Sequence, residues 1–182
     1  MSSPALAVST RPPAELEGDA LIVGIAPAAA GDEAVQLVGI GEGPLGAVAA
    51  GLRMLGLTGA VDETSRIPAP AGVAAASILV VGLGRTPLTP EALRTAAGTA
   101  ARALGTAARV GVALPTGTAA DVQAVLEGAA MGAYRFTDYR SGESTPGTAS
   151  IELASDVEGA EQAADAARAT AAAVALVRDL VN

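Results

Sequence analysis

Apolar runs of strand length alternate with helical patterns along the chain, and this alternation restricts the fold more than any other feature. Uninterrupted runs rich in Ile, Leu and Val occur at 20–26, 76–84 and 109–114, and Pro115 closes the last of them. Runs without polar alternation are typical of strands covered on both faces, as in parallel sheets. The order βαβαβα predicts an α/β fold, a three-layer sandwich with a mostly parallel central sheet.

Two helices in the middle of the chain carry start signals. Thr89-Pro90-Glu91 combines a capping hydroxyl, a preset φ and a first-turn carboxylate, and Thr118 with Asp121 resembles a capping box. Gly128 and Gly132 lie on one side of the second helix, so we expect a neighbouring backbone to approach closely there. Apolar residues at helical steps predict the buried faces: Leu93, Ala96, Ala97, Ala100 and Leu104, then Val122, Val125, Leu126, Ala129, Ala133 and Phe136.

The first 72 residues give weaker signals. Residues 1–18 are polar and contain prolines, and we expect them to form a flexible N-terminal segment. The pattern at 34–40 fits a strand or a helix, and 44–55 predicts a helix. Residues 58–72 predict an irregular stretch or an edge strand, because their two prolines cannot donate to a sheet ladder.

The C-terminal part predicts one strand and one long helix. Residues 148–154 alternate well enough for a strand, and Ser155 with Glu158 predicts the cap of a helix over 156 to about 181. The chain then stops at Asn182, a residue that often begins a helix cap, with no following chain to complete a turn.

Missing residue types exclude several kinds of chemistry. The chain has no Cys and no His, and all 11 basic residues are Arg. Without Cys there is no disulfide or thiolate nucleophile, and without His the usual general base near neutral pH is absent. Without Lys there is no Schiff base and no phosphate-loop lysine.

The charge balance argues against nucleic acids and membranes as partners. The formal net charge is −8 and the arginines are scattered, whereas nucleic-acid binding depends on clustered basic residues that neutralise phosphates. No stretch is apolar over the ~18 residues that a membrane span needs, and the N-terminus does not resemble a signal peptide. We therefore expect a soluble cytoplasmic protein.

The segment from Gly41 to Gly46 matches the dinucleotide-binding pattern G-x-G-x-x-G. Asp62 and Glu63 lie about 20 residues further on, where such folds place the acid that binds the ribose. However, the chain has 22 glycines, so chance matches are easy, and Pro44 removes a donor from the loop that should cradle the phosphates. A glycine-rich turn without a ligand is the favoured interpretation.

Two further stretches have a functional and a structural interpretation. The junction at 80–89 runs from a strand through Gly-x-Gly into a helix, with Arg85 beside it, and is either a phosphate site or an ordinary turn. Residues 134–144 gather both tyrosines, the single Phe and two arginines, and form either a contact surface or the anchor of a helix in an alanine-rich core. The structural interpretation is favoured in both cases.

Carboxylate groupings are sparse. Asp32-Glu33 and Asp62-Glu63 are sequence neighbours, so their side chains diverge in regular structure. Glu158, Glu161 and Asp165 share one helix face and are typical of a solvated surface near a helix N-terminus. The sequence therefore assigns no catalytic residue, no cofactor-binding residue and no metal ligand.

Three stretches together resemble one protein family, the leucyl aminopeptidases, also called cytosol aminopeptidases. They are 76–104, 125–141 and 173–182. The second contains Glu127 to Ser141, which is similar to the family's EGxxLGxYxFxxYKS with Arg140 where Lys is common. The third ends in 178–182, which looks like the family's ARDLxN. The resemblance extends over residues 20 to 182 and is weakest between 27 and 70. It implies a macro-domain-like N-terminal domain over 19–182, ending in the helix that leads to a catalytic domain.

The resemblance also implies a function for the parent protein. Family members are hexameric metallo-aminopeptidases, hydrolases that use two divalent ions, Mn or Zn, held in a C-terminal domain with an NTDAEGR stretch. This chain lacks that stretch and every lysine, so no family catalytic residue can be assigned to it. The expected partners are its own catalytic domain and the sister subunits of a homo-hexamer. The alternatives are a macro-like module that binds a nucleotide or ADP-ribose and, against the net charge, a regulatory contact with DNA.

Overall fold

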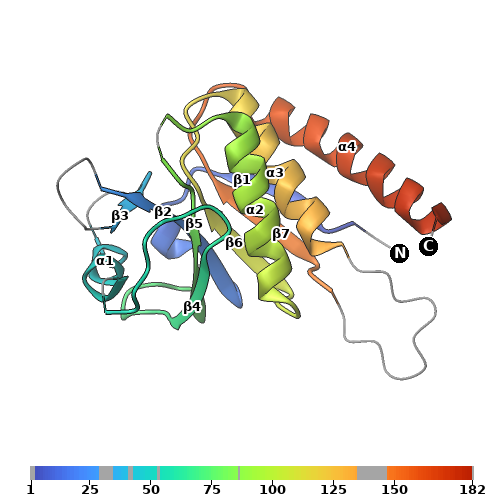
Figure 1. Ribbon diagram of the computed structural model, residues 1–182. Coiled ribbons are helices and arrows are strands. Elements are labelled where there is room, and N and C mark those ends of the chain that lie inside the picture. Colours follow the sequence, from blue (N-terminus) through green and yellow to red (C-terminus); the bar gives the residue numbers. More distant parts are fainter. Residues whose placement is uncertain are drawn as a thin grey trace, which may run out of the picture.

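A seven-stranded mixed sheet runs through the molecule (Figure 1). The structure is a computed structural model that describes residues 3–28, 35–40, 43–52, 54–85, 87–134 and 147–181. The strand order is β1-β7-β6-β2-β5-β4, with β3 paired to β2 off this path, and the four pairings from β1 to β5 are parallel. The strands are β1 (Ala5–Ser9), β2 (Ala20–Pro27), β3 (Val35–Val38), β4 (Thr64–Pro68), β5 (Ser77–Gly82), β6 (Arg109–Ala113) and β7 (Ser150–Ala154).

Helices cover both faces of the sheet and complete the predicted three layers. The long helices α2 (Pro90–Leu104), α3 (Ala119–Ala133) and α4 (Ala160–Val181) lie side by side on one face (Figure 1). The other face is covered by α1 (Gly46–Leu52) and by the short 3₁₀ helix η1 (Pro13–Glu15). The α/β class and the mostly parallel sheet are therefore confirmed.

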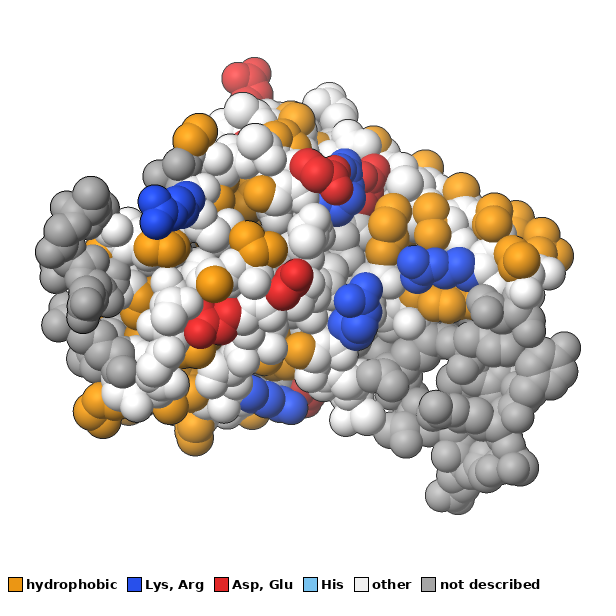
Figure 2. Space-filling model, viewed as in Figure 1, with side chains coloured by type: hydrophobic (Ala, Val, Ile, Leu, Met, Phe, Trp, Pro, Cys, Tyr) orange, Lys and Arg blue, Asp and Glu red, His pale blue; other side chains and the backbone are white. Residues whose placement is uncertain are grey.

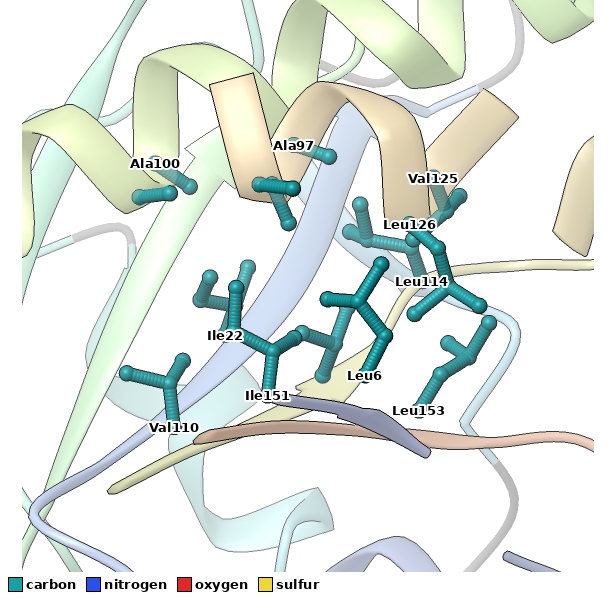
Figure 3. Packing of buried hydrophobic residues seen from close by; sticks show 14 of the residues in the cluster. Leu6, Ile22, Ala97, Ala100, Val110, Leu114, Val125, Leu126, Ile151 and Leu153 are labelled. Carbon is teal, nitrogen blue, oxygen red and sulfur yellow. The ribbon is translucent and has the colours of Figure 1, made fainter. Parts of the chain in front are cut away.

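The core lies in two clusters, one on each face of the sheet, because successive strand residues point to opposite sides. In β2, Ile22 faces α2 and α3, whereas Leu21 and Val23 face the layer that holds α1. Figure 3 shows the larger cluster, in which leucine, isoleucine and valine side chains of the strands meet small alanines such as Ala97 and Ala100 of α2. Small helix residues allow the helices to lie close to the sheet.

The predicted caps and buried faces of α2 and α3 are confirmed. The Thr89 hydroxyl accepts a hydrogen bond from the amide of Ala92 at 3.2 Å. Thr118 and Asp121 exchange side-chain to backbone hydrogen bonds at 3.2 and 2.9 Å, which completes a capping box. All the residues predicted for the two buried faces are buried, except Phe136, which lies outside the described residues.

The predicted close backbone approach at the α3 glycines is also confirmed. A Cβ at Gly128 would lie 2.1 Å from the carbonyl oxygen of Arg94, and one at Gly132 would lie 2.2 Å from that of Gly98. Both distances are far shorter than a van der Waals contact, so α2 and α3 touch through their backbones. Only glycine fits these two positions without moving a helix.

The N-terminal segment differs from its prediction. Ala5–Ser9 is a strand that pairs in parallel with β7, and Leu16, just after η1, is 0% exposed. The expectation of a flexible segment over 1–18 is therefore wrong for this part. Its short strand is rich in alanine, so it lacks the bulky apolar run that marks the other strands.

The last helix also differs from its prediction, because it begins at Ala160 rather than at 156. Gly159 precedes it with φ 80°, and the Gly159 carbonyl accepts from the amide of Ala163. The Ser155 hydroxyl instead accepts from the amide of Val157 at 3.4 Å and pairs with the hydroxyl of Thr116 at 3.0 Å. Ser155 and Glu158 are thus not the cap of this helix.

The two segments for which the sequence left two structures open form antiparallel strands. Residues 35–38 become β3, which pairs with the end of β2, and residues 64–68 become the edge strand β4, which pairs with β5. Pro68 lies at the last position of β4, as the edge-strand interpretation requires. The helix expected over 44–55 is shorter, because α1 ends at Leu52.

Candidate functional site

The segment with the dinucleotide pattern does not lie in a dinucleotide-binding unit. Such a unit needs parallel strands on both sides of its helix, whereas β3 before the segment and β4 after it pair antiparallel to their neighbours. The Glu63 carboxylate accepts from the amides of Thr58 and Gly59 at 2.9 and 2.7 Å. Asp62 accepts from the Thr99 hydroxyl at 2.9 Å. Glu63 thus holds the local turn together and Asp62 ties this turn to α2, while Gly41 and Glu42 lie outside the described residues.

The second glycine junction, at the end of β5, is an ordinary turn packed against the segment 59–61. The amides of Gly82, Leu83 and Gly84 donate to the carbonyls of Glu63, Ile25 and Gly59. A Cβ at Gly82 would lie 1.8 Å from the carbonyl oxygen of Ala60, so this glycine allows chain segments to touch. These three amides are therefore not free to bind a phosphate, which argues against the nucleotide interpretation for the described part of this loop.

A cavity of about 580 Å³ opens at the carboxyl ends of β1, β6 and β7. This is where open α/β sheets commonly bind ligands. Its basic side chain, Arg11, donates to the Glu152 carboxylate at 2.7 Å. Its Asp121 carboxylate accepts from the amides of Gly117 and Thr118, at 3.1 and 2.9 Å. The charges of Arg11 and Asp121 are thus engaged within the protein.

A buried carboxylate joins the helices on the larger core face, and the sequence did not predict it. Glu127 of α3 is 5% exposed, and its carboxylate accepts from Arg94 of α2 at 2.8 Å and from Gln123 at 2.8 Å. Burial tends to raise the pKa of Glu127, but the hydrogen bonds from Gln123 and Arg94 outweigh it, and the pKa lies below its ordinary value. The signal in the sequence was a single Glu among the apolar residues of a helix face, because a buried carboxylate requires a partner.

Metal-binding groups are missing from the part of the chain that the structure describes. It contains no cluster of three Asp, Glu, His or Cys side chains that could hold an ion. Glu158, Glu161 and Asp165 are exposed, as predicted, and Glu161 and Asp165 pair with Arg168. Glu158 precedes α4, however, so the three do not share one helix face. The donor set of the described residues therefore does not fit a two-metal centre. Among the same residues, no helix is both long and apolar enough to cross a bilayer.

Tyr134 anchors the end of α3 to the end of α4. Its hydroxyl donates to the Asp179 carboxylate at 2.7 Å, and the Arg178 guanidinium lies 5.1 Å from the centre of its ring. This supports the interpretation of Tyr134 as a helix anchor, while residues 135–144 of the same stretch lie outside the described residues.

The far end of α4 exposes an apolar ridge, which we define as Leu176, Val177, Leu180 and Val181. Their exposed fractions are 61%, 58%, 78% and 77%, in contrast to the buried alanines of the first half of the helix. Figure 2 shows hydrophobic side chains gathered along this end of α4 at the right of the view. Large exposed apolar side chains that adjoin one another mark surfaces that bind other protein.

A match to a protein-family model identifies the family of this chain. The cytosol aminopeptidase family, N-terminal domain, matches residues 23–143, which is more than half of the chain. This chain belongs to the cytosol aminopeptidase family. The match starts within β2 and contains β3 to β6 and α1 to α3, whereas β1, β7 and α4 lie outside it.

Relatives of this aminopeptidase domain are much longer than the chain. It is 45% identical over 150 residues to the "Probable cytosol aminopeptidase" of Streptomyces griseus, covering 76% of the chain and 28% of the relative. It is 40% identical over 190 residues to the protein of the same name from Clavibacter michiganensis, covering 100% of the chain and 37% of the relative. The chain thus spans about a third of the length of the relatives it matches.

Solved structures show the same relationship. The bottromycin maturation enzyme BotP in complex with Mn is 29% identical, with a TM-score of 0.66 over 90% of this chain and 32% of that chain. A mutant of tomato leucine aminopeptidase, 20% identical, has the same fold, with a TM-score of 0.75 over 100% of this chain and 39% of that chain. These two likenesses cover 90% and 100% of this chain, but only 32% and 39% of the two solved chains.

Proposed function

We propose that this chain is the non-catalytic N-terminal domain of a cytoplasmic metallo-aminopeptidase, an enzyme that removes N-terminal amino acids from peptides. The observation that carries the proposal is the coverage: the chain aligns over its whole length with about a third of a cytosol aminopeptidase. Peptide hydrolysis would then belong to the part of the relatives outside this alignment. The expectation that the chain itself has no catalytic residue remains a prediction.

The metal ions would be bound by the same part of the relatives, the part outside this alignment. BotP is named as a complex with Mn, and two divalent ions, Mn or Zn, are what the family resemblance implies. The described residues of this chain offer no donor cluster for them, and the chain has neither His nor Cys. The role left to this domain is to support the assembly of the enzyme.

Assembly requires surfaces that other parts of the enzyme cover, and the ridge on α4 is such a surface. Its four side chains would lose contact with water if the catalytic domain or a sister subunit packed on them, at a gain of roughly 1.5–3 kcal/mol for each side chain fully buried. The partners we propose are therefore the domain's own catalytic domain and the other subunits of a homo-hexamer.

An activity assay tests whether catalysis belongs to the part of the enzyme outside this chain. The purified chain is incubated with leucine p-nitroanilide and manganese, beside the full-length relative from Clavibacter michiganensis as the positive control. We expect no turnover above the buffer rate, and calorimetry with manganese should give no heat of specific binding. Metal-dependent turnover by the chain alone would overturn the proposal.

A further inference from the structure

None of residues 172–181, the described end of α4, is fully buried, and side-chain contacts attach this end to α3. The buried residues of this helix all lie between its first residue and Ala171: Ala160, Ala163, Ala164, Ala167 and Ala171. Beyond Ala171 the helix continues for ten residues and exposes the ridge. An exposed extension of a formed helix gains little stability from packing and frays readily at its end. Its presence therefore calls for a specific attachment.

That attachment joins the ends of two helices. The Tyr134 hydroxyl donates to Asp179 Oδ1 at 2.7 Å, and Arg178 Nη1 donates to the carbonyl oxygen of Met131 at 3.0 Å. The Arg178 guanidinium also lies over the Tyr134 ring, 5.1 Å from its centre. Met131 lies in the last turn of α3, where carbonyls lack partners within the helix and attract cations.

Asp179 is an informative member of this attachment, because a carboxylate is unfavourable at the C-terminal end of a helix. A carboxylate in the last turn of a helix faces the negative end of the helix dipole, so Asp179 weakens α4 on its own account. The hydrogen bond that Asp179 accepts from the Tyr134 hydroxyl offsets this loss of helix stability. Tyr134 is also one of only three aromatic residues in the sequence. Two of the three stretches that carry the family resemblance, around Tyr134 and around Arg178-Asp179, thus meet each other in space.

We propose that Tyr134, Arg178 and Asp179 form a latch that keeps the end of α4 helical and fixes its direction relative to α3. The latch thereby holds the ridge in one orientation relative to α3. Its consequence rests on the proposed function, since in an intact aminopeptidase the latch would orient the catalytic domain on this one. The latch itself is a property of this chain and can be tested without the catalytic domain.

Amide hydrogen exchange of the purified chain tests the latch directly. The variant Tyr134→Phe removes the hydroxyl donor and keeps the ring. We expect amides of residues 174–178 to exchange about tenfold faster, because a hydrogen bond to a charged group is lost from the closed state. Exchange in α2 and β5 should stay unchanged. The matched control is Thr99→Val, which removes a hydroxyl bound to the Asp62 carboxylate at 2.9 Å far along the chain from α4.

A double-mutant cycle separates the latch from a general loosening of the helix. In the background Asp179→Asn, Tyr134→Phe should increase exchange much less than in the wild type, since its charged acceptor is gone. Equal effects in both backgrounds, or no effect of Tyr134→Phe on residues 174–178, would overturn the proposal. Activity of the isolated chain would overturn the proposed function instead and would leave the exchange result standing.

Discussion

Replacing Gly132 by Ala should separate α2 from α3. The new Cβ would lie 2.2, 2.8 and 2.9 Å from the carbonyl oxygen, carbonyl carbon and Cα of Gly98. These are backbone atoms and cannot rotate away as the end of a side chain can, so the helices must move apart by about an ångström to reach ordinary contact. Overpacking of this kind costs about 1–3 kcal/mol, and a rigid backbone contact favours the upper end.

The same substitution also has a favourable part, because Ala is a better helix former than Gly by about 1 kcal/mol. The net loss for Gly132→Ala is therefore about 2 kcal/mol, which for a domain of this size lowers Tm by roughly 4–8 °C. Urea unfolding followed by far-UV circular dichroism is the suitable assay, since the chain has no Trp.

Gly51→Ala is the matched control. Gly51 also lies in a helix, α1, but no heavy atom lies within 4 Å of its ideal Cβ position. The helix-forming gain should then appear alone, as an increase in stability of up to about 1 kcal/mol. A Gly132→Ala variant as stable as the wild type, or two variants that shift in the same direction, would refute the reasoning.

Three further substitutions probe the cap, a close approach and the buried carboxylate. Thr118→Ala should lower stability by about 1 kcal/mol in urea unfolding, because α3 loses its capping box. Gly82→Ala should lower it by at least about 3 kcal/mol, since its Cβ would lie 1.8 Å from the Ala60 oxygen; a soluble, fully folded variant with an unchanged Tm would contradict this. Glu127 has a pKa below its ordinary value of 4.5, so its stabilising effect is present above that pH and is lost as the pH falls. Glu127→Gln should therefore lower the urea midpoint at pH 7 and lower it much less at pH 3; equal losses at both would show that the charge plays no part.

The strands and helices with strong local signals were predictable from the sequence. The run at 76–84 and the Thr89 cap gave β5 and α2 because burial on both faces and a capping hydroxyl leave local marks. The strand β1 was not predictable in the same way. Its residues are small and its stability comes from pairing with β7, which lies far away in the sequence.

The sites depended on contacts that no local pattern encodes. Glu127 could be recognised as unusual within an apolar helix face, but its partner Arg94 is 33 residues away. Tyr134 and Asp179 are 45 residues apart, and their hydrogen bond exists because α3 and α4 lie side by side. The dinucleotide pattern at Gly41 to Gly46 shows the converse, since a matching string of letters lies between antiparallel strands.

Replacement of the N-terminal domain in a longer relative tests the central claim most directly. The chain aligns over its whole length with 37% of the Clavibacter michiganensis aminopeptidase, so it can be joined to the remainder of that protein. The chimera and the remainder alone are compared by particle mass and by turnover of leucine p-nitroanilide with manganese. We predict that the chimera forms hexamer-sized particles with turnover, whereas the remainder alone does not assemble fully. A remainder that assembles and turns over substrate as well as the chimera would contradict the account.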